Sequence, residues 1–193
     1  GVMEAFLKGL ERRHATGKPV SGIASVASFF VSRVDTLVDS LLDQKGGPDT
    51  LKGKAAVANA RLAYQLFKQK FGDGRWAKLA AAGAMIQRPL WASTSTKNPT
   101  YPDCIYVDNL IGPDTVNTAP PQTIAAFVDH GVPKLTIEDG VAESKALMDK
   151  LAAQGIDMKN VTDELLADAV KKFNEPFQQL LDAIEARRGA LVN

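Results

Sequence analysis

The feature that most constrains the fold is a buried run that is followed almost at once by a positive charge. Residues 23–31 read IASVASFFV, a mostly apolar run of small, β-branched and aromatic residues. Such a run predicts a strand that is buried on both faces, as in a parallel sheet. Arg33 follows two residues later. We therefore expect a guanidinium at, or just beyond, the C-terminal end of this strand.

Two further strand-like runs alternate with helical patterns. Residues 87–93 (QRPLWAS) form a second buried run, residues 116–118 (VNT) a third short strand, and CIYVDNLIG reads as a short strand or a helical turn. This alternation predicts an α/β fold with parallel strands. The helical patterns cover residues 1–15, 34–43, 53–71, 76–82, 120–131 and 141 onward, with breaks expected at Gly155 and Pro176.

The amino-acid composition limits which binding partners and which cellular compartment we expect. The chain has 193 residues, enough for one sizeable core, and its 23 basic and 22 acidic side chains nearly cancel. The overall charge therefore predicts no nucleic-acid partner and no membrane partner. A single cysteine, Cys104, allows no internal disulfide and gives no metal framework. This cysteine usage fits a reducing cytoplasm, so we expect a cytoplasmic protein.

Arg33 allows two interpretations. It could be a structural arginine that pairs with a carboxylate such as Asp35. Alternatively it could clamp an anion, because a guanidinium presents a fixed fork of donors that suits phosphate. Parallel sheets place ligand chemistry where the strands end, and Ser28 lies five residues earlier in the same strand.

The second strand ends in a comparable way. The loop after it reads WASTSTKNP, so hydroxyl groups and Lys97 follow the buried run directly. Such residues also make ordinary turns and are weak evidence alone. Two neighbouring strands that end in cationic loops at the same edge, however, favour one anion site. Polar neighbours should keep Lys97 protonated, which argues against its acting as a nucleophile.

Three stretches carry a family resemblance: SVASFFVSRVD, LKGKAAVANARLAYQLF and QRPLWASTSTKNPTYPDCIYVDNLIGPDTVNTAPPQTIAAFVDHG. Together they resemble the C-terminal part of a bacterial or plant-type transaldolase. The resemblance implies a TIM (β/α)8 barrel, of which this chain would hold about strands six to eight plus C-terminal helices. It also implies transfer of a dihydroxyacetone unit between sugar phosphates through a lysine Schiff base, with no metal or organic cofactor.

The resemblance assigns roles to several residues. It implies that Arg33 holds the sugar phosphate, that Ser28 faces the substrate hydroxyls and that Phe30 walls the pocket. Ser93 matches a phosphate-contacting serine of the seventh strand.

Two assignments are looser. Better-known transaldolases have an arginine two residues after that serine, where this chain has Ser95, so Lys97 is the expected substitute. Asn117, at the mouth of the eighth strand, is expected either to line the site or to serve a turn.

The family's catalytic lysine motif, lysine-valine/isoleucine-proline-alanine/glycine-threonine on the fourth strand, does not occur in the chain. We therefore expect the chain to begin after the fifth strand, with residues 1–138 as barrel and 139–193 as a helical extension. A full barrel needs roughly 250 residues.

The expected partners are sugar phosphates and the missing barrel half or another protein chain. One reading is a transaldolase of the non-oxidative pentose phosphate pathway, acting on sedoheptulose 7-phosphate or fructose 6-phosphate with glyceraldehyde 3-phosphate or erythrose 4-phosphate. The alternative is a non-catalytic sugar-phosphate-binding or structural fragment.

Overall fold

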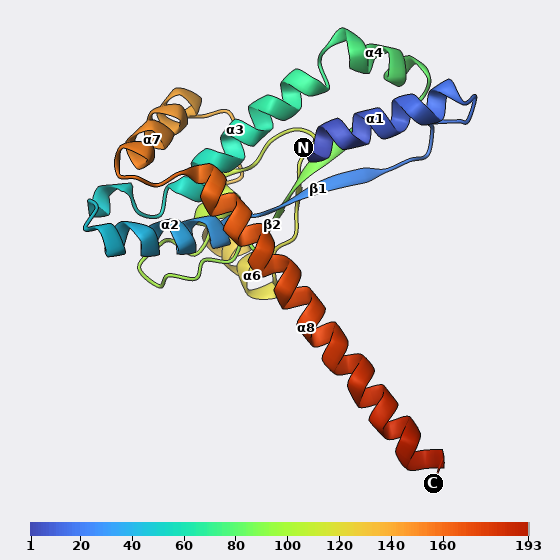
Figure 1. Cartoon of the computed structure of the whole chain (residues 1–193). Helices are drawn as coiled ribbons and strands as arrows, with labels where there is room; N and C mark the ends of the chain where they lie inside the picture. Colours follow the sequence, from blue (N-terminus) through green and yellow to red (C-terminus); the bar gives the residue numbers. More distant parts are fainter. Residues whose placement is uncertain (193) are drawn as a thin grey trace.

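A computed structural model describes residues 1–192 of the chain, with side chains up to residue 189. Its helices and strands alternate through most of the sequence, and a long helix ends it (Figure 1). The elements are α1 (Val2–Ala15), β1 (Ser25–Phe30), α2 (Val31–Lys45), η1 (Asp49–Leu51), α3 (Ala55–Lys70), α4 (Gly74–Ala81), β2 (Gln87–Ala92), α5 (Ile105–Asn109), β3 (Val116–Asn117), α6 (Pro121–His130), α7 (Val141–Ala153) and α8 (Met158–Val192).

The three strands form one parallel sheet in the order β1-β2-β3, which confirms the predicted α/β class. Ser28 lies opposite Leu90, and Leu90 lies opposite Val116. Because all three strands run in the same direction, their C-terminal ends meet at one edge of the sheet. Within residues 1–192, β1 and β3 each keep one side without a partner strand.

Only one face of the sheet is covered. Ala27 and Trp91 are buried, and Phe29 packs edge-on against the Trp91 ring. On the other face Val26 and Ser28 are exposed, as is Arg88. The prediction of a strand buried on both faces is therefore wrong for β1, because no described element packs on this second face.

The main core lies between the covered face and the surrounding helices. It joins Trp91 of the sheet to apolar side chains of α2, α3 and α5 and to Leu151 of α7. The indole N–H of Trp91 donates to the Leu110 carbonyl at 3.1 Å, so its one polar group is satisfied. This core fixes α2 against the end of the sheet.

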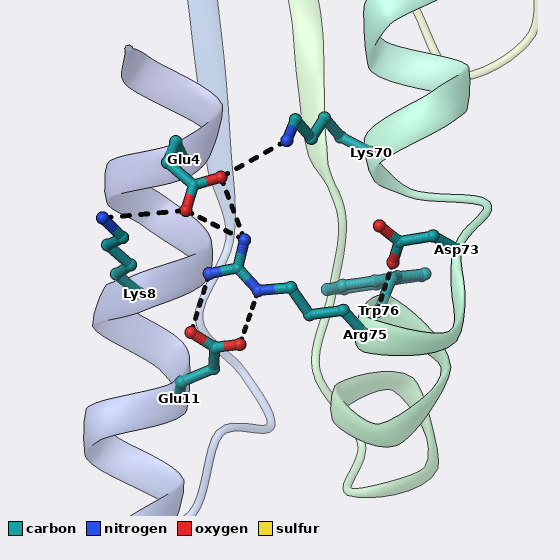
Figure 2. A network of polar contacts seen from close by, with 7 residues as sticks. All are labelled: Glu4, Lys8, Glu11, Lys70, Asp73, Arg75 and Trp76. Atoms are coloured by element: carbon teal, nitrogen blue, oxygen red, sulfur yellow. Dashed lines mark hydrogen bonds and ion pairs between the residues drawn. The ribbon is translucent and has the colours of Figure 1, made fainter.

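A smaller apolar cluster joins α1 to α4 and is flanked by an ion-pair network (Figure 2). Leu7, Leu10 and Trp76 supply its buried side chains. Beside them the Arg75 guanidinium donates to both carboxylate oxygens of Glu11 and to Glu4. This planar fork matches two carboxylates on one face of α1, which ties the two helices together.

Two boundaries differ from the sequence prediction. The first strand ends at Phe30, so Val31 and Arg33 belong to the first turn of α2. Pro176 does not break the last helix, since α8 continues through it. An interior proline removes one backbone hydrogen bond and crowds the carbonyl four residues earlier, which is why a break is expected there. No helix among the described residues is long and apolar enough to cross a membrane.

Candidate functional site

The site lies where the first turn of α2 meets the loop after β2. The Ser32 N–H donates to the Ser93 carbonyl at 3.1 Å, which joins the two segments directly. Ser93 holds a left-handed backbone conformation with φ at 53°. Such a conformation is unfavourable for a residue other than glycine and recurs at functional sites.

A cavity of about 510 Å³ opens beside this junction. Three segments line it: the first turns of α2, the loop after β2 and the beginning of α8. Its lining residues are Ser32, Arg33, Thr36, Leu37, Ser40, Ser93, Lys97, Glu164, Leu165, Asp168 and Lys172. The structure therefore brings three of the predicted site residues, Arg33, Ser93 and Lys97, to one cavity.

Two buried side-chain donors of residues that line this cavity have no hydrogen-bond partner among the described residues. They are the Oγ of Ser32 and the Nη1 of Arg33. Buried polar atoms are almost always satisfied, so two neighbouring exceptions need an explanation. The guanidinium carbon of Arg33 lies 4.6 Å from the centre of the Phe30 ring, which holds the side chain by a cation–π contact.

The cavity also carries charge from outside α2. Lys97 Nζ lies 2.6 Å from Ser95 Oγ, and Lys172 Nζ lies 2.6 Å from a carboxylate oxygen of Asp168. Three cations and the carboxylates of Glu164 and Asp168 therefore share the lining. The backbone N–H groups at the start of α2 add partial positive charge at the same place. Positive charges outnumber negative ones in this lining, so the cavity favours an anionic ligand.

The loop that carries Lys97 is tied to α2. The Tyr101 hydroxyl donates to Asp39 Oδ2 at 2.8 Å, and the Gly53 N–H donates to Asp39 Oδ1 at 3.0 Å. Burial, with the Asp39 carboxylate beside it, raises the pKa of Tyr101 to about 12, so the hydroxyl stays a donor. These bonds hold the loop beside the cavity.

Asp35 is not the partner of Arg33. Its carboxylate accepts hydrogen bonds from the Ala56 N–H at 2.8 Å and from the Tyr106 hydroxyl at 2.9 Å. Burial raises the pKa of Asp35 to about 6, against the opposing effect of these two hydrogen bonds. The expected pairing of Arg33 with Asp35 is therefore wrong, and the contact described for the Arg33 guanidinium is with the Phe30 ring.

The other predicted site residues lie outside this cavity. Ser28 is exposed on the uncovered face of the sheet. Phe30 touches the site only through its ring, beneath Arg33. Asn117 accepts a hydrogen bond from Thr94 Oγ1 at 2.8 Å and lines a different cavity, beside Leu110 and Phe127.

Sequence reasoning missed Ser32 and Lys172. Ser32 adjoins Arg33, but the pattern that begins the helix at Val34 leaves Ser32 outside it, whereas the structure places Ser32 in the first turn of α2. Lys172 lies more than 130 residues from Arg33 on a helix whose position depends on tertiary packing. No local pattern marks it as part of this site.

One group of side chains within residues 1–192 has the ligand types of a metal site. Potential ligand atoms of Asp103, Cys104 and His130 lie within 4.8 Å of one another. His130 Nε2 instead pairs with Asp103 at 2.8 Å, and this contact raises the histidine pKa. Burial raises the pKa of the Cys104 thiol, which disfavours the thiolate that a metal requires. The group is therefore explained as a hydrogen-bonded cluster between α5 and α6.

Comparison with known proteins bears on what the cavity does. A family model described as Transaldolase/Fructose-6-phosphate aldolase matches residues 2–184. The chain is similar to a transaldolase of Parafrankia sp. (51% identity over 98% of this chain and 52% of that protein) and to one of Mycolicibacterium smegmatis (50%, with the same shares). A protein named Transaldolase 2 of Nostoc sp. is 48% identical over 95% of this chain and 51% of its own length. The chain thus spans about half the length of these curated relatives. Since the family model matches nearly all of it, the chain belongs to the transaldolase/fructose-6-phosphate aldolase family.

Proposed function

We propose that this chain forms the phosphate-binding side of a transaldolase active site. In this proposal it corresponds to the C-terminal part of the barrel, with β1, β2 and β3 as strands six, seven and eight. The reaction moves a dihydroxyacetone unit from sedoheptulose 7-phosphate or fructose 6-phosphate to glyceraldehyde 3-phosphate or erythrose 4-phosphate. Its expected setting is the non-oxidative pentose phosphate pathway.

One observation carries the proposal: two adjacent residues of the cavity lining, Ser32 and Arg33, each hold a buried side-chain donor, the Oγ and the Nη1, for which the described residues offer no hydrogen-bond partner. A phosphate group supplies acceptor oxygens for both donors and a negative charge for the guanidinium. Ser93 and Lys97 line the same cavity from the neighbouring strand. A phosphate at the ends of two adjacent parallel strands would leave the rest of the sugar free to reach groups on other strands.

The Schiff-base lysine is proposed to lie outside these 193 residues. A lysine attacks a carbonyl near neutral pH only when burial or a neighbouring charge lowers its pKa. No lysine among the described residues is buried. Lys97 is exposed and hydrogen-bonded to Ser95, so it suits a phosphate contact better than a nucleophile. The chain alone is therefore expected to bind sugar phosphate without turning it over.

The second candidate is a protein that binds sugar phosphates without catalysis. The absence of a buried lysine from the described residues is the observation that favours it. The two candidates predict the same phosphate cavity. They differ in whether a complementary polypeptide restores Schiff-base chemistry.

Titration of fructose 6-phosphate into the 193-residue chain, followed by amide chemical shifts, tests the phosphate cavity. We expect the amides of Ser32, Arg33 and Ser93 to shift. Arg33→Ala should weaken binding about tenfold or more, since a hydrogen bond to a charged group contributes about 1.5–3 kcal/mol. Arg33→Lys should recover only part of this affinity, because a point charge does not reproduce the fork.

Two controls make the titration specific. Lys97→Ala should weaken binding less than Arg33→Ala does, since Lys97 is exposed. Arg12→Ala removes an exposed arginine from α1, outside the cavity lining, and should leave the affinity unchanged. Equal affinities for wild type and Arg33→Ala would refute the phosphate assignment.

A further inference from the structure

Another cavity, of about 490 Å³, opens between α3 and α7, which pack side by side (Figure 1). We call it the α3–α7 cavity. Residues of η1, the first turns of α3, α5 and one side of α7 line it. None of them lines the phosphate cavity beside Arg33. The α3–α7 cavity is therefore a separate place on the molecule, and its volume is typical of small-molecule pockets, which span about 300–1,000 Å³.

The α3–α7 cavity carries more positive than negative charge. Its lining holds three cations, Lys54, Arg61 and Lys150, and one carboxylate, Glu143. None of these four side chains forms an ion pair with a residue that the structure describes, whereas several lysines elsewhere pair with a carboxylate. The lining therefore has an excess of two positive charges.

Arg61 is the most enclosed of the three cations. Its Nη2 donates to Asn109 Oδ1 at 3.1 Å and to the Thr136 carbonyl at 3.3 Å. Its Nε is buried and has no hydrogen-bond partner among the described residues. Burial lowers the pKa of the guanidinium, against the opposing effect of Asp139 and Glu143. A charge that is partly removed from water and has no ion pair is stabilised by an anionic ligand.

The start of α7 lies beside the guanidinium of Arg61. A Cβ added at Gly140 would lie 3.2 Å from Arg61 Nη1, so the missing side chain allows this close approach. Gly140 also has a φ of 63°, which glycine adopts without strain. No described side chain caps the first N–H groups of α7. The start of this helix therefore adds partial positive charge near the three cations.

The rest of the lining combines apolar side chains with hydroxyl groups. The residues are Leu51, Val57, Ile105 and Leu147, with Thr50 and Ser144. Such a mixture fits an organic anion better than a bare ion. A phosphate monoester carries a charge of about −1.5 to −2 near neutral pH, which matches the excess of two positive charges.

We propose that the α3–α7 cavity binds a small phosphate monoester. The phosphate lies against Lys54, Arg61 and Lys150, and the organic part lies against the apolar side chains. This second site does not rest on the proposed function, because the two cavities share no lining residue.

Titration of phenyl phosphate into the 193-residue chain, followed by amide chemical shifts, tests this site. We expect saturable shifts of the Gly53 and Ser144 amides. The double variant Lys54→Gln/Lys150→Gln should weaken this binding about tenfold or more, because two of the three cations are removed. Both lysines are exposed, so their replacement leaves the core intact. Lys145→Gln removes an exposed cation of α7 outside the lining and should leave the affinity unchanged.

Two further probes test the class of ligand. Inorganic phosphate should shift the same amides but bind more weakly, since it lacks an apolar part, and phenol should shift neither amide. Equal affinities for inorganic phosphate and phenyl phosphate would show a site for a bare anion and overturn the proposal. Phenol that binds as tightly as phenyl phosphate, or a double variant with wild-type affinity, would overturn it as well.

The phosphate cavity is followed in the same titration through the Ser32 and Ser93 amides. Arg33→Ala should weaken the response of these two amides and leave that of Gly53 and Ser144 unchanged. Shifts confined to Ser32 and Ser93 would overturn this inference and keep the proposed function. Shifts confined to Gly53 and Ser144 would keep this inference and count against the proposed function.

Discussion

At the scale of single residues, the site is defined by donors that the protein leaves unpaired. Arg33 and Ser32 each keep a buried donor without a partner, while the neighbouring Asp35 is fully used by Ala56 and Tyr106. The fold thus separates a cation from the nearest carboxylate in sequence. This separation leaves the positive charge of Arg33 free for a ligand.

Asp35 gives a prediction about pH. Its folded-state pKa of about 6 lies above the ordinary value of 3.8, so the folded state binds a proton more tightly than the unfolded state does. The associated stability is fully present below about pH 4 and is lost as the pH rises through 6. Asp35→Asn removes this dependence. Relative to the variant, the wild-type free energy of unfolding should fall by up to about 3 kcal/mol between pH 4 and pH 7. Urea unfolding of both proteins across this range measures the difference, and parallel curves would contradict the assignment.

The residues of the site were predictable to the extent that they lie near strand ends. Arg33, Ser93 and Lys97 were found because each follows a buried run, and the structure brings them together at one cavity. Lys172 and Glu164 were not predicted as site residues, because they reach the cavity only through the packing of α8 on α2. The roles of Ser28 and Asn117 stay predictions, since both lie outside this cavity and depend on groups beyond it.

At the scale of elements, the sequence patterns predict whether a segment is a helix or a strand better than they predict where it begins and ends. The predicted alternation of strands and helices is confirmed. The sequence pattern begins the helix after β1 at Val34, three residues later than the structure does. The reason is that Val31 is apolar and continues the strand pattern. Burial in the first turn of a helix and in a strand cannot be told apart from such a short run.

The docking of α1 on α4 gives a prediction at this scale. Hydrogen bonds from Arg75 lower the pKa of Glu4 and of Glu11. The stability from these two carboxylates is therefore present above their ordinary pKa of 4.5 and is lost as the pH falls through their lowered values. Arg75→Gln should destabilise the protein near neutral pH. As the pH falls, the variant should lose less stability than the wild type does.

Thermal unfolding of wild type and Arg75→Gln at several pH values between 3 and 6 measures this effect. Lys78→Gln changes an exposed cation on the same helix that has no ion pair with α1, so it serves as the control. An Arg75→Gln protein that loses stability toward acid as steeply as wild type would show that the network in Figure 2 does not hold the helices together.

At the scale of the whole molecule, the sheet is open on three sides. Among the residues that the structure describes, β1 and β3 each lack a partner strand on one side, and no element covers the face that bears Val26 and Ser28. Large apolar side chains of α8 are exposed as well. Exposed edges and apolar faces of this kind favour association. The sequence predicted part of a barrel by resemblance, and the open sheet is compatible with that prediction. The parts that would close it are proposed to correspond to the half of the relatives that this chain does not span.

The most direct test of this account is borohydride trapping with fructose 6-phosphate, mapped by mass spectrometry. The 193-residue chain is assayed alone and together with the complementary half of the Mycolicibacterium smegmatis transaldolase. We expect no adduct on the chain alone and, in the mixture, an adduct only on the added half. Trapping in the mixture should need about tenfold more fructose 6-phosphate when the chain carries Arg33→Ala, because the phosphate has lost its clamp. An adduct on Lys97 or any other lysine of this chain, or trapping that is indifferent to Arg33→Ala, would contradict the division into a phosphate-binding and a catalytic half.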